Sequence, residues 1–347
     1  MRAVVFSGGG PDQLEMTELP DPEAGPGEVL VRVRACAMNH LDVWATGPSR
    51  AGVSSAAAVS QAGPRILGAD ISGEVVDTGP GVSGFTADDR VLSYPAVPCE
   101  RCQECQYGRH GRCPDLTIIG SPARPGGYGE LVALPASNLF TVPDNLSFEE
   151  AASIPVVFMT AWEMLITKGH LQTGEWVLVN AAGSGVGVAA IQLAKLLGAK
   201  VVTNASTQEK RRMGLELGAD AAVDYTKEGW GEEVRRIADD EGVHLVADNV
   251  GGDVLVESWN ALRPGGKLVT CGLTAGRQVT LELPLRKQTS LELSFLGSRA
   301  HLGELLPYFR SGQLRAVLHS VLPFERVKEG HEAMINRGNF GKIVLTW

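Results

Sequence analysis

Four cysteines lie within fifteen residues of the sequence, with the spacing Cys99-x2-Cys102-x2-Cys105-x7-Cys113. Four thiolates at such short intervals can surround a tetrahedral zinc ion at about 2.3 Å, and four protein ligands leave no open position for a substrate. Clustered cysteines in a reducing compartment more often bind metal than form disulfides. We therefore predict one structural zinc per chain, in a lobe at about residues 95–115. A redox-active CxxC pair or an iron–sulfur cluster is the alternative.

A glycine-rich stretch, Ala182-Gly183-Ser184-Gly185-Val186-Gly187, is the second feature that can do chemistry. It separates a short β-branched run, Trp176–Val179, from an apolar pattern at helical spacing that Gly198 ends, which predicts strand, loop and helix. Glycines in such a loop let a pyrophosphate approach the main chain at the positive end of the helix. The predicted dinucleotide-binding residues here are Gly183, Ser184, Gly185, Val186 and Gly187.

Alternating strand and helix signals continue after this loop. The expected strands are Lys200–Asn204, Ala221–Asp224, Leu245–Asn249, Lys267–Cys271 and Leu291–Leu296. The expected helices cover Gln208–Leu217, Glu232–Asp239 and the region around Val254–Leu262. This alternation predicts an α/β fold with a doubly wound parallel sheet whose first crossover binds the dinucleotide. Glycines that serve only helix packing in another α/β protein are the alternative.

Residues 1 to about 140 differ from the middle of the chain, because short β-rich runs alternate with Gly and Pro turns. Such runs are Val29–Ala35, Ile71–Asp77 and Tyr128–Leu134, and they predict a β-barrel-like domain of short strands. The stretch 46–64 is rich in Gly, Ala and Ser without apolar periodicity, so we predict a mobile loop there. It is either a lid or a plain surface insertion.

Composition excludes several classes of protein. The chain has 347 residues, which suits two domains, and its 44% hydrophobic and 20% charged residues are typical of a soluble globular protein. No apolar stretch approaches the ~20 residues of a membrane span. The net charge of -9 without a basic stripe argues against a nucleic-acid partner. The first residues show no charged leader with an apolar segment, so we expect a cytoplasmic protein that acts on a small molecule.

The glycine-rich loop and the cysteine lobe together resemble the medium-chain dehydrogenase/reductase superfamily, which includes zinc alcohol dehydrogenases and quinone oxidoreductases. Further matching segments are Pro26-Gly27-Glu28-Val29-Leu30-Val31, Gly68-Ala69-Asp70, Gly79-Pro80-Gly81-Val82 and Gly341-Lys342-Ile343-Val344-Leu345. The resemblance implies a GroES-like catalytic domain over residues 1–150, to which residues 298–347 return. It also implies a Rossmann domain over residues 151–297 and an active site in the cleft.

The same resemblance shows which positions would bind a catalytic zinc ion if this chain had one. Family alcohol dehydrogenases hold a catalytic zinc with a Cys three residues before an Asp, the His of a GHE motif, and a further Cys or Glu. Here Asn39 stands three residues before Asp42, the triplet is Gly68-Ala69-Asp70, and the third region, 154–160, is largely apolar. Cys36 comes three residues too early and is expected to be a small packing residue. We therefore expect one zinc per chain, without a catalytic one.

These substitutions resemble the zinc-free quinone oxidoreductase branch. Its N-x-x-D and LT-A patterns are similar to Asn39-His40-Leu41-Asp42 and Met159-Thr160-Ala161-Trp162, although the cysteine lobe is less usual there. Asp42 and Asp70 are then expected either to hydrogen-bond the backbone or to be weak polar neighbours of the cleft.

The choice of dinucleotide depends on the strand Lys200–Asn204. In an NAD enzyme an acidic residue near its end bonds the adenosine ribose, but here Ala205-Ser206-Thr207 follows. No carboxylate there would repel a 2′-phosphate, Lys210 is within reach, and Tyr225 matches a family position near that phosphate. We predict NADP(H) over NAD(H), with Ser206, Lys210 and Tyr225 as contacts. Arg211 and Arg212 are either further contacts or solubilising residues.

Other cofactor contacts are implied by the resemblance alone. Asn39 and Thr160 would face the nicotinamide and position it with the substrate, and His40 would meet the pyrophosphate. The strand ends that follow at the carboxyl edge of the sheet contribute Asn249, Val250, Gly272 and Leu273. Asn339 and Phe340 would cap the cofactor from the other domain.

The expected reaction follows from the missing catalytic metal. Without a Lewis acid, an aldehyde has nothing to hold its developing charge, whereas a quinone or a conjugated alkene delocalises it. We predict an NADPH-dependent reductase of quinones or α,β-unsaturated carbonyl compounds. The alternatives are an alcohol dehydrogenase with an atypical metal site from His40, Asp42 and Asp70, and a non-catalytic NADPH-binding protein. The apolar strand Leu291–Leu296 predicts a homodimer or homotetramer through sheet extension.

Overall fold

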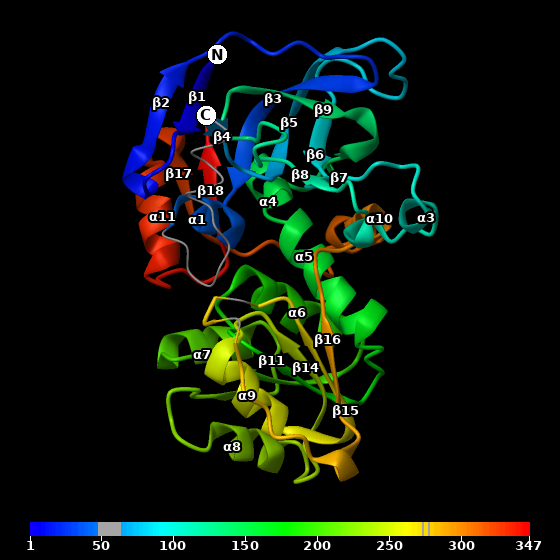
Figure 1. Cartoon of the computed structure of the whole chain (residues 1–347), viewed down its shortest axis with the longest axis vertical. Coiled ribbons are helices and arrows are strands. Elements are labelled where there is room, and N and C mark those ends of the chain that lie inside the picture. The colour runs from blue at the N-terminus through cyan, green and yellow to red at the C-terminus, as the bar shows by residue number, and fades with distance from the viewer. Residues whose placement is uncertain (48–63, 273, 277) are drawn as a thin grey trace. The chain divides into compact units, whose positions relative to one another are not determined.

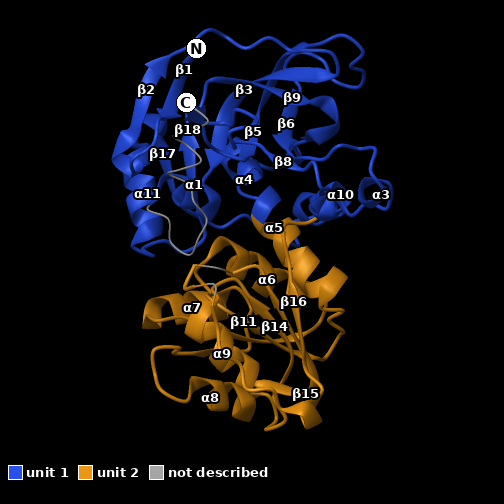
Figure 2. Cartoon of the chain, viewed as in Figure 1, with its two compact units in different colours: residues 1–156, 298–347 blue, residues 157–297 orange. Residues whose placement is uncertain are grey.

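The computed structural model describes residues 1–47, 64–272, 274–276 and 278–347. The chain forms two compact units, unit 1 from residues 1–156 and 298–347 and unit 2 from residues 157–297 (Figure 2). The segment 151–156, assigned to the second domain from the sequence, falls in unit 1, because helix α4 (Phe148–Ala152) packs on strands of unit 1. Most of the predicted loop 46–64 lies outside the described residues.

Unit 1 is built on a seven-stranded sheet with the order β10-β6-β5-β3-β18-β17, in which β9 also pairs with β3. The strands are β3 (Glu28–Ala37), β5 (Asp70–Thr78), β6 (Arg90–Ser93), β9 (Leu131–Pro135), β10 (Leu139–Thr141), β17 (Leu318–Pro323) and β18 (Lys342–Thr346). The alternating pattern of β3 turns Val29, Val31 and Val33 into the core. The β3–β18 pairing, with Ala37 opposite Val344, joins both ends of the chain into one unit.

Smaller elements complete unit 1 (Figure 1). A three-stranded sheet has the order β2 (Leu14–Glu18), β1 (Arg2–Phe6), β4 (Arg65–Ile66), and a two-stranded sheet pairs β7 (Ala96–Val97) with β8 (Thr117–Ile118). The helices are α1 (His40–Thr46), α3 (Gln103–Gln106), α4, α10 (Arg299–Arg310) and α11 (Val327–Ile335). Short 3-10 turns lie at Pro11–Gln13, His110–Arg112, Ala136–Asn138 and Phe324–Arg326. The β7–β8 pair flanks the cysteine lobe in the sequence.

Unit 2 contains a six-stranded, all-parallel sheet with the order β13-β12-β11-β14-β15-β16, which confirms the predicted α/β fold. The strands are β11 (Trp176–Val179), β12 (Lys200–Asn204), β13 (Ala221–Val223), β14 (Val243–Asp248), β15 (Leu262–Thr270) and β16 (Ser290–Leu293). The helices are α6 (Gly185–Leu196), α7 (Gln208–Glu216), α8 (Trp230–Ile237) and α9 (Gly252–Asn260). Helix α5 (Pro155–Trp162) enters the unit from unit 1, followed by a π-helical turn at Glu163–Lys168; a 3-10 turn lies at Leu285–Lys287.

The strand order reverses between β11 and β14, which are neighbours in the sheet but far apart in sequence. In open parallel sheets, ligands bind outside the carboxyl ends of the strands at such a switch point. The predicted strand Leu291–Leu296 is shorter in the structure, where β16 ends at Leu293. Leu296 itself has a left-handed φ of 54°, which a strand residue does not adopt. Within the described residues, no helix combines the length and the apolar character that crossing a membrane requires.

Candidate functional site

The predicted glycine-rich loop lies directly after β11, at the switch point of unit 2. Ser184 caps α6: its Oγ accepts the N–H of Gly187 at 2.8 Å and donates to Oδ1 of Asn249 at 3.2 Å. A Cβ atom on Gly187 would lie only 2.1 Å from the carbonyl oxygen of Ala181, so the close approach requires glycine. The loop is therefore tied to the residue that follows β14, and it presents the N-terminus of a helix.

A buried polar network supports this edge of the sheet. Asn180 Nδ2 donates to Asp248 Oδ1 at 2.9 Å, and Asn204 Nδ2 donates to Asn180 Oδ1 at 2.7 Å. Thr270 Oγ1 donates to Asp248 Oδ2 at 2.6 Å. All four residues follow or end adjacent parallel strands, and their exposed fraction is at most 6%. Burial raises the pKa of Asp248, and the donors of Thr270 and Asn180 oppose that shift.

Sequence reasoning missed this network, although polar residues at the carboxyl ends of several strands were a usable signal. Asn204 Oδ1 also accepts the N–H of Ala181 at 2.8 Å. Ala181 has a left-handed φ of 58°, which is uncommon for a residue with a Cβ atom. The network thus holds the entry to the glycine-rich loop in a backbone conformation that the loop residues alone would not favour.

Two further predicted positions meet at the same edge. A Cβ atom on Gly272 would lie 2.1 Å from the backbone nitrogen of Val250, so the segments after β14 and β15 are in close contact. The N–H of Gly272 donates to Thr270 Oγ1 at 3.0 Å, and that of Val250 donates to Asp248 Oδ1 at 3.1 Å. Leu273 lies outside the described residues.

The residues predicted to select the phosphate lie after β12 and β13. Ser206 is exposed, and Lys210 and Tyr225 are half-buried. Arg211 is bound on two sides: its Nη1 lies 3.0 Å from Asp224 Oδ2 and donates to the carbonyl oxygen of Ala205 at 3.0 Å.

Asp224 was not weighed in the sequence analysis as a carboxylate next to the predicted phosphate position. Its Oδ1 accepts the hydroxyl of Thr226 at 2.7 Å, and this bond, the Thr226 N–H and the charge of Arg211 lower its pKa. Arg212 pairs instead with Glu216 on the exposed face of α7. Of the two arginines, only Arg211 reaches the ends of the strands.

In unit 1, three polar side chains meet where β3, β5 and β18 lie side by side. Nζ of Lys342 donates to Asn39 Oδ1 at 2.7 Å and lies 3.1 Å from Asp70 Oδ2. Nδ2 of Asn39 donates to Asp70 Oδ2 at 2.9 Å. The exposed fractions are 5% for Lys342, 4% for Asn39 and 0% for Asp70. We call these three residues the lysine cluster.

Asp70 of the cluster and the nearby Asp42 also accept hydrogen bonds from the backbone, which is one of the two expectations from the sequence. Asp42 accepts the N–H groups of Asn39 at 2.8 Å and Gly68 at 3.1 Å, and Asp70 accepts that of Val156 at 3.0 Å. Burial raises the pKa of Asp42 to about 6. Cys36 is fully buried in the core, as expected of a packing residue.

The alternative metal site from His40, Asp42 and Asp70 is not assembled in unit 1. His40 begins α1, and its ring lies near that of Trp44, with the centroids 6.1 Å apart. Among the described residues, the four cysteines form the only group of at least three His, Cys, Asp or Glu side chains close enough to share a metal ion.

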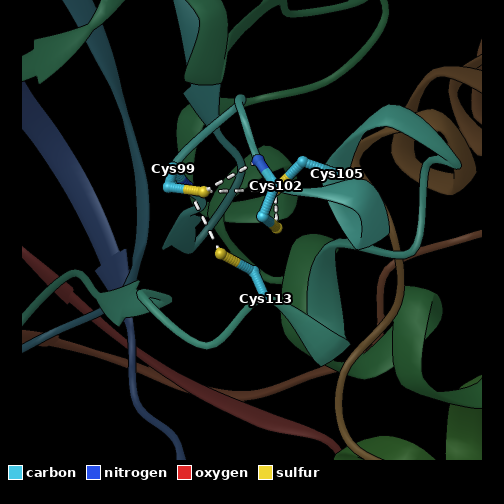
Figure 3. A group of neighbouring side chains, drawn as sticks. All are labelled: Cys99, Cys102, Cys105 and Cys113. Carbon is cyan, nitrogen blue, oxygen red and sulfur yellow. Dashed lines mark hydrogen bonds between the residues drawn. The ribbon is translucent and has the colours of Figure 1, made fainter.

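The Sγ atoms of these four cysteines all lie within 4.8 Å of one another and turn toward a common space (Figure 3). Cys102 N–H donates to Cys99 Sγ at 3.4 Å, and Cys99 N–H donates to Cys113 Sγ at 3.4 Å. Backbone N–H groups lower the pKa of Cys99 to about 6, whereas burial raises that of Cys105 to about 12. The cluster brings together the predicted ligand set, and four sulfur donors fit a tetrahedral zinc ion.

The cysteine lobe is also tied to helix α10. Nη1 of Arg299 lies 2.7 Å from Glu100 Oε1, and the N–H of Arg299 donates to His110 Nδ1 at 3.3 Å.

The other predicted cofactor contacts of unit 1 lie near the start of β18. Asn339 Nδ2 donates to the carbonyl oxygen of Gly341 at 2.9 Å, and Phe340 is buried. Thr160 lies in α5 of unit 2 and is also buried.

Two family models match the chain. Residues 25–144 match the model described as "Alcohol dehydrogenase GroES-like domain", and residues 185–311 match "Zinc-binding dehydrogenase".

Similar proteins cover nearly the whole chain. The "Synaptic vesicle membrane protein VAT-1 homolog" of Rattus norvegicus is 30% identical over 99% of this chain and 84% of its own length. The "2-haloacrylate reductase" of a Burkholderia species is 28% identical over 99% of this chain and 98% of its own length. A crystal structure described as "NAD-dependent alcohol dehydrogenase" has a TM-score of 0.93 and 42% identity, with 100% of both chains covered.

Proposed function

The chain belongs to the medium-chain dehydrogenase/reductase superfamily and is an oxidoreductase, and from this premise we propose that it is an NADPH-dependent reductase of quinones or α,β-unsaturated carbonyl compounds. The observation that carries the proposal is the lysine cluster. At the positions where family alcohol dehydrogenases hold a catalytic zinc, this chain has the methyl group of Ala69 and the amide of Asn39, which accepts from the ammonium of Lys342. These groups do not fit a metal ion, because an ammonium has no lone pair to donate and repels a cation.

The cysteine cluster fits one zinc ion per chain. The zinc is structural, since Cys99, Cys102, Cys105 and Cys113 use all four tetrahedral positions. It stiffens the lobe through which Arg299 of α10 is held, by the bonds to Glu100 and His110.

The carboxyl edge of the parallel sheet fits a dinucleotide. Gly187 lets α6 pack closely against the backbone of Ala181, and the N-terminus of α6 follows β11 directly, as a dinucleotide-binding crossover requires. The proposed NADP(H) contacts in unit 2 are Thr160, Gly183, Ser184, Gly185, Val186, Gly187, Ser206, Lys210, Tyr225, Asn249, Val250, Gly272 and Leu273. The resemblance adds Asn39, His40, Asn339 and Phe340 of unit 1.

The preference for NADP(H) rests on charge. Ser206 offers a hydroxyl where an NAD enzyme has a carboxylate, and Arg211 pairs with Asp224, the carboxylate that directly follows β13. The similar protein named as an NAD-dependent alcohol dehydrogenase favours NAD(H) instead.

The acceptor is an electron-poor double bond. NADPH, when bound, supplies a hydride from its nicotinamide ring. The chain orients the acceptor, with Asn39 and Thr160 as the proposed positioning residues. Since the side chains at the family's catalytic-zinc positions do not fit a metal ion, an acceptor that delocalises its developing charge is favoured. The relative named 2-haloacrylate reductase points to the same class, because a 2-haloacrylate is an alkene conjugated to a carboxylate.

We test this function by anaerobic oxidation of NADPH with a simple quinone, a conjugated enone or a saturated aldehyde, using protein of measured zinc content. Turnover of the quinone or the enone alone is the expected result, and the relative rates choose between them. Aldehyde turnover, or oxidation of an alcohol by NAD⁺, that a chelator abolishes would instead mean an alcohol dehydrogenase with an atypical metal site. Tight NADPH binding without turnover of any acceptor would mean a non-catalytic binding protein.

A further inference from the structure

One hydrogen-bond donor in the lysine cluster has no partner among the described residues. The ammonium of Lys342 has three N–H groups, and its two acceptors there are Asn39 Oδ1 at 2.7 Å and Asp70 Oδ2 at 3.1 Å. The side chain of Lys342 is only 6% exposed. The described residues therefore leave one N–H of this ammonium available to an acceptor outside the described chain.

The two acceptors of Lys342 are themselves held in place by further hydrogen bonds. Asn39 Nδ2 donates to both Asp70 Oδ2 at 2.9 Å and the carbonyl oxygen of Ala37 at 3.3 Å, which fixes the orientation of its amide. Asp70 Oδ1 accepts from the N–H of Val156. The ammonium is therefore held in place by two fixed acceptors, with one donor left over.

The segments that this donor contacts correspond to those that hold a catalytic group in related enzymes. Asn39 and Asp70 lie at the segments that, by resemblance, surround the catalytic zinc of family alcohol dehydrogenases, so the ammonium of Lys342 bonds to the segments that hold a metal cation in those relatives. A preorganised cationic donor in a water-poor site stabilises an oxygen that gains negative charge. Of the side chains in the cluster, only Lys342 can act on such an oxygen.

We propose that Lys342 is a catalytic residue that donates its remaining N–H to the carbonyl or quinone oxygen of the acceptor. This inference rests on the proposed function. As hydride adds to the β-carbon of an enone, the electron pair of the C=C bond shifts and the carbonyl oxygen becomes an enolate oxygen. NADPH is oxidised, the acceptor is reduced, and a solvent proton then adds to the α-carbon. Lys342 keeps its own proton throughout and stabilises the enolate by charge and hydrogen bonding.

The test uses 4-nitrophenol, which imitates the enolate oxygen and whose neutral and ionised forms absorb differently. The zinc-loaded full-length protein, with and without NADP⁺, is titrated with this phenol across pH. We expect the wild type to bind the phenolate at least about tenfold more tightly than the phenol, which lowers the pKa of the bound ligand by about one unit. Lys342→Met should abolish that preference, whereas the matched surface variant Lys328→Met should keep it.

Two further variants separate charge from folding. Lys342→Met with Asp70→Asn removes both members of the ion pair, and this variant should fold but show no phenolate preference. Asp70→Asn alone leaves the ammonium less neutralised and should strengthen the preference. In turnover, Lys342→Met should lower kcat by about a hundredfold, as removal of one oxyanion donor does elsewhere.

Either of two results would overturn the proposal. The wild type could show no preference for the phenolate, or Lys342→Met could retain the preference while losing stability, in which case Lys342 only neutralises Asp70. The titration needs no turnover, so its outcome is independent of whether the protein reduces quinones or enones.

Discussion

Nζ of Lys342 lies 3.1 Å from Oδ2 of Asp70, and the two residues begin strands β18 and β5, which flank β3 in one sheet. The pair is buried, with side-chain exposures of 6% and 0%. A buried ion pair costs desolvation, and the neighbouring bonds from Asn39 and Val156 offset that cost. The ion pair is therefore expected to affect the free energy of unfolding as well as catalysis.

Asp70→Asn should lower the free energy of unfolding by about 3–5 kcal/mol, because it leaves a buried ammonium without its counter-charge. Urea denaturation monitored by circular dichroism measures the change. The double variant with Lys342→Met should recover most of the loss. Glu329→Gln, which breaks the exposed pair with Arg326, is the control and should leave the midpoint nearly unchanged. An Asp70→Asn protein as stable as the wild type would contradict the assigned burial of the pair.

The cysteine cluster should bind one zinc ion per chain, measured by elemental analysis. Cys105→Ser should remove the zinc and lower the melting temperature, because one of four ligands is lost. Cys271→Ala is the matched control, since Cys271 belongs to unit 2 and is not a member of the cluster, and it should keep one zinc. Two zinc ions per chain, or iron in place of zinc, would refute the assignment.

Ser206→Asp should shift the cofactor preference from NADPH toward NADH. The new carboxylate would lie after β12, where it repels a 2′-phosphate and accepts the ribose hydroxyls. We expect the ratio of the two kcat/KM values to change by about tenfold or more, which is a modest electrostatic effect at an exposed site. Thr280→Asp places the same charge on an exposed position elsewhere in unit 2 and should leave the ratio unaltered. An equal ratio in both variants would argue against NADP(H) selection at Ser206.

Gly187→Ala should weaken dinucleotide binding strongly. The added Cβ would meet the carbonyl oxygen of Ala181 at 2.1 Å, so the loop must move away from the position that the Ser184 cap defines. Fluorescence titration with NADPH measures the dissociation constant. Gly303→Ala in helix α10 should bind like the wild type, because its Cβ would lie 3.5 Å from the ring of Phe140 in ordinary contact. Normal binding by Gly187→Ala would show that the cofactor does not use this loop.

Leu293→Lys should convert the proposed oligomer to monomers. Strand β16 is the edge of the parallel sheet, and Leu293 and Phe295 expose 73% and 54% of their surface. An edge strand with exposed apolar side chains favours pairing with a second copy, and a lysine there opposes it. Light scattering after size exclusion reports the mass, with Met16→Lys in unit 1 as the control. A monomeric wild type, or a dimeric Leu293→Lys protein, would contradict this interface.

Local patterns in the sequence were enough to predict the fold of unit 2. Strand β12 has the predicted bounds, Lys200–Asn204, and α7 ends one residue before the predicted Leu217. The bounds of β15 were less accurate: it begins at Leu262, five residues before the predicted Lys267, because it pairs with β14 across an irregularity in register. The spacing of apolar residues predicts which side chains are buried. Burial alone does not show at which residue a strand begins to pair with its neighbour.

Residue types and spacing along the chain determined the α/β alternation, the glycine-rich loop and the cysteine cluster. Each helix or strand, the loop and the cysteine cluster is a short segment whose pattern is read locally, without reference to distant strands. Only the tertiary structure decided which polar groups meet across strands. Lys342 reaches Asn39 over 303 positions of sequence because β18 pairs with β3, and Asn180 reaches Asp248 because β14 pairs with β11. Such contacts depend on the order and register of strands, which no local spacing of residues encodes.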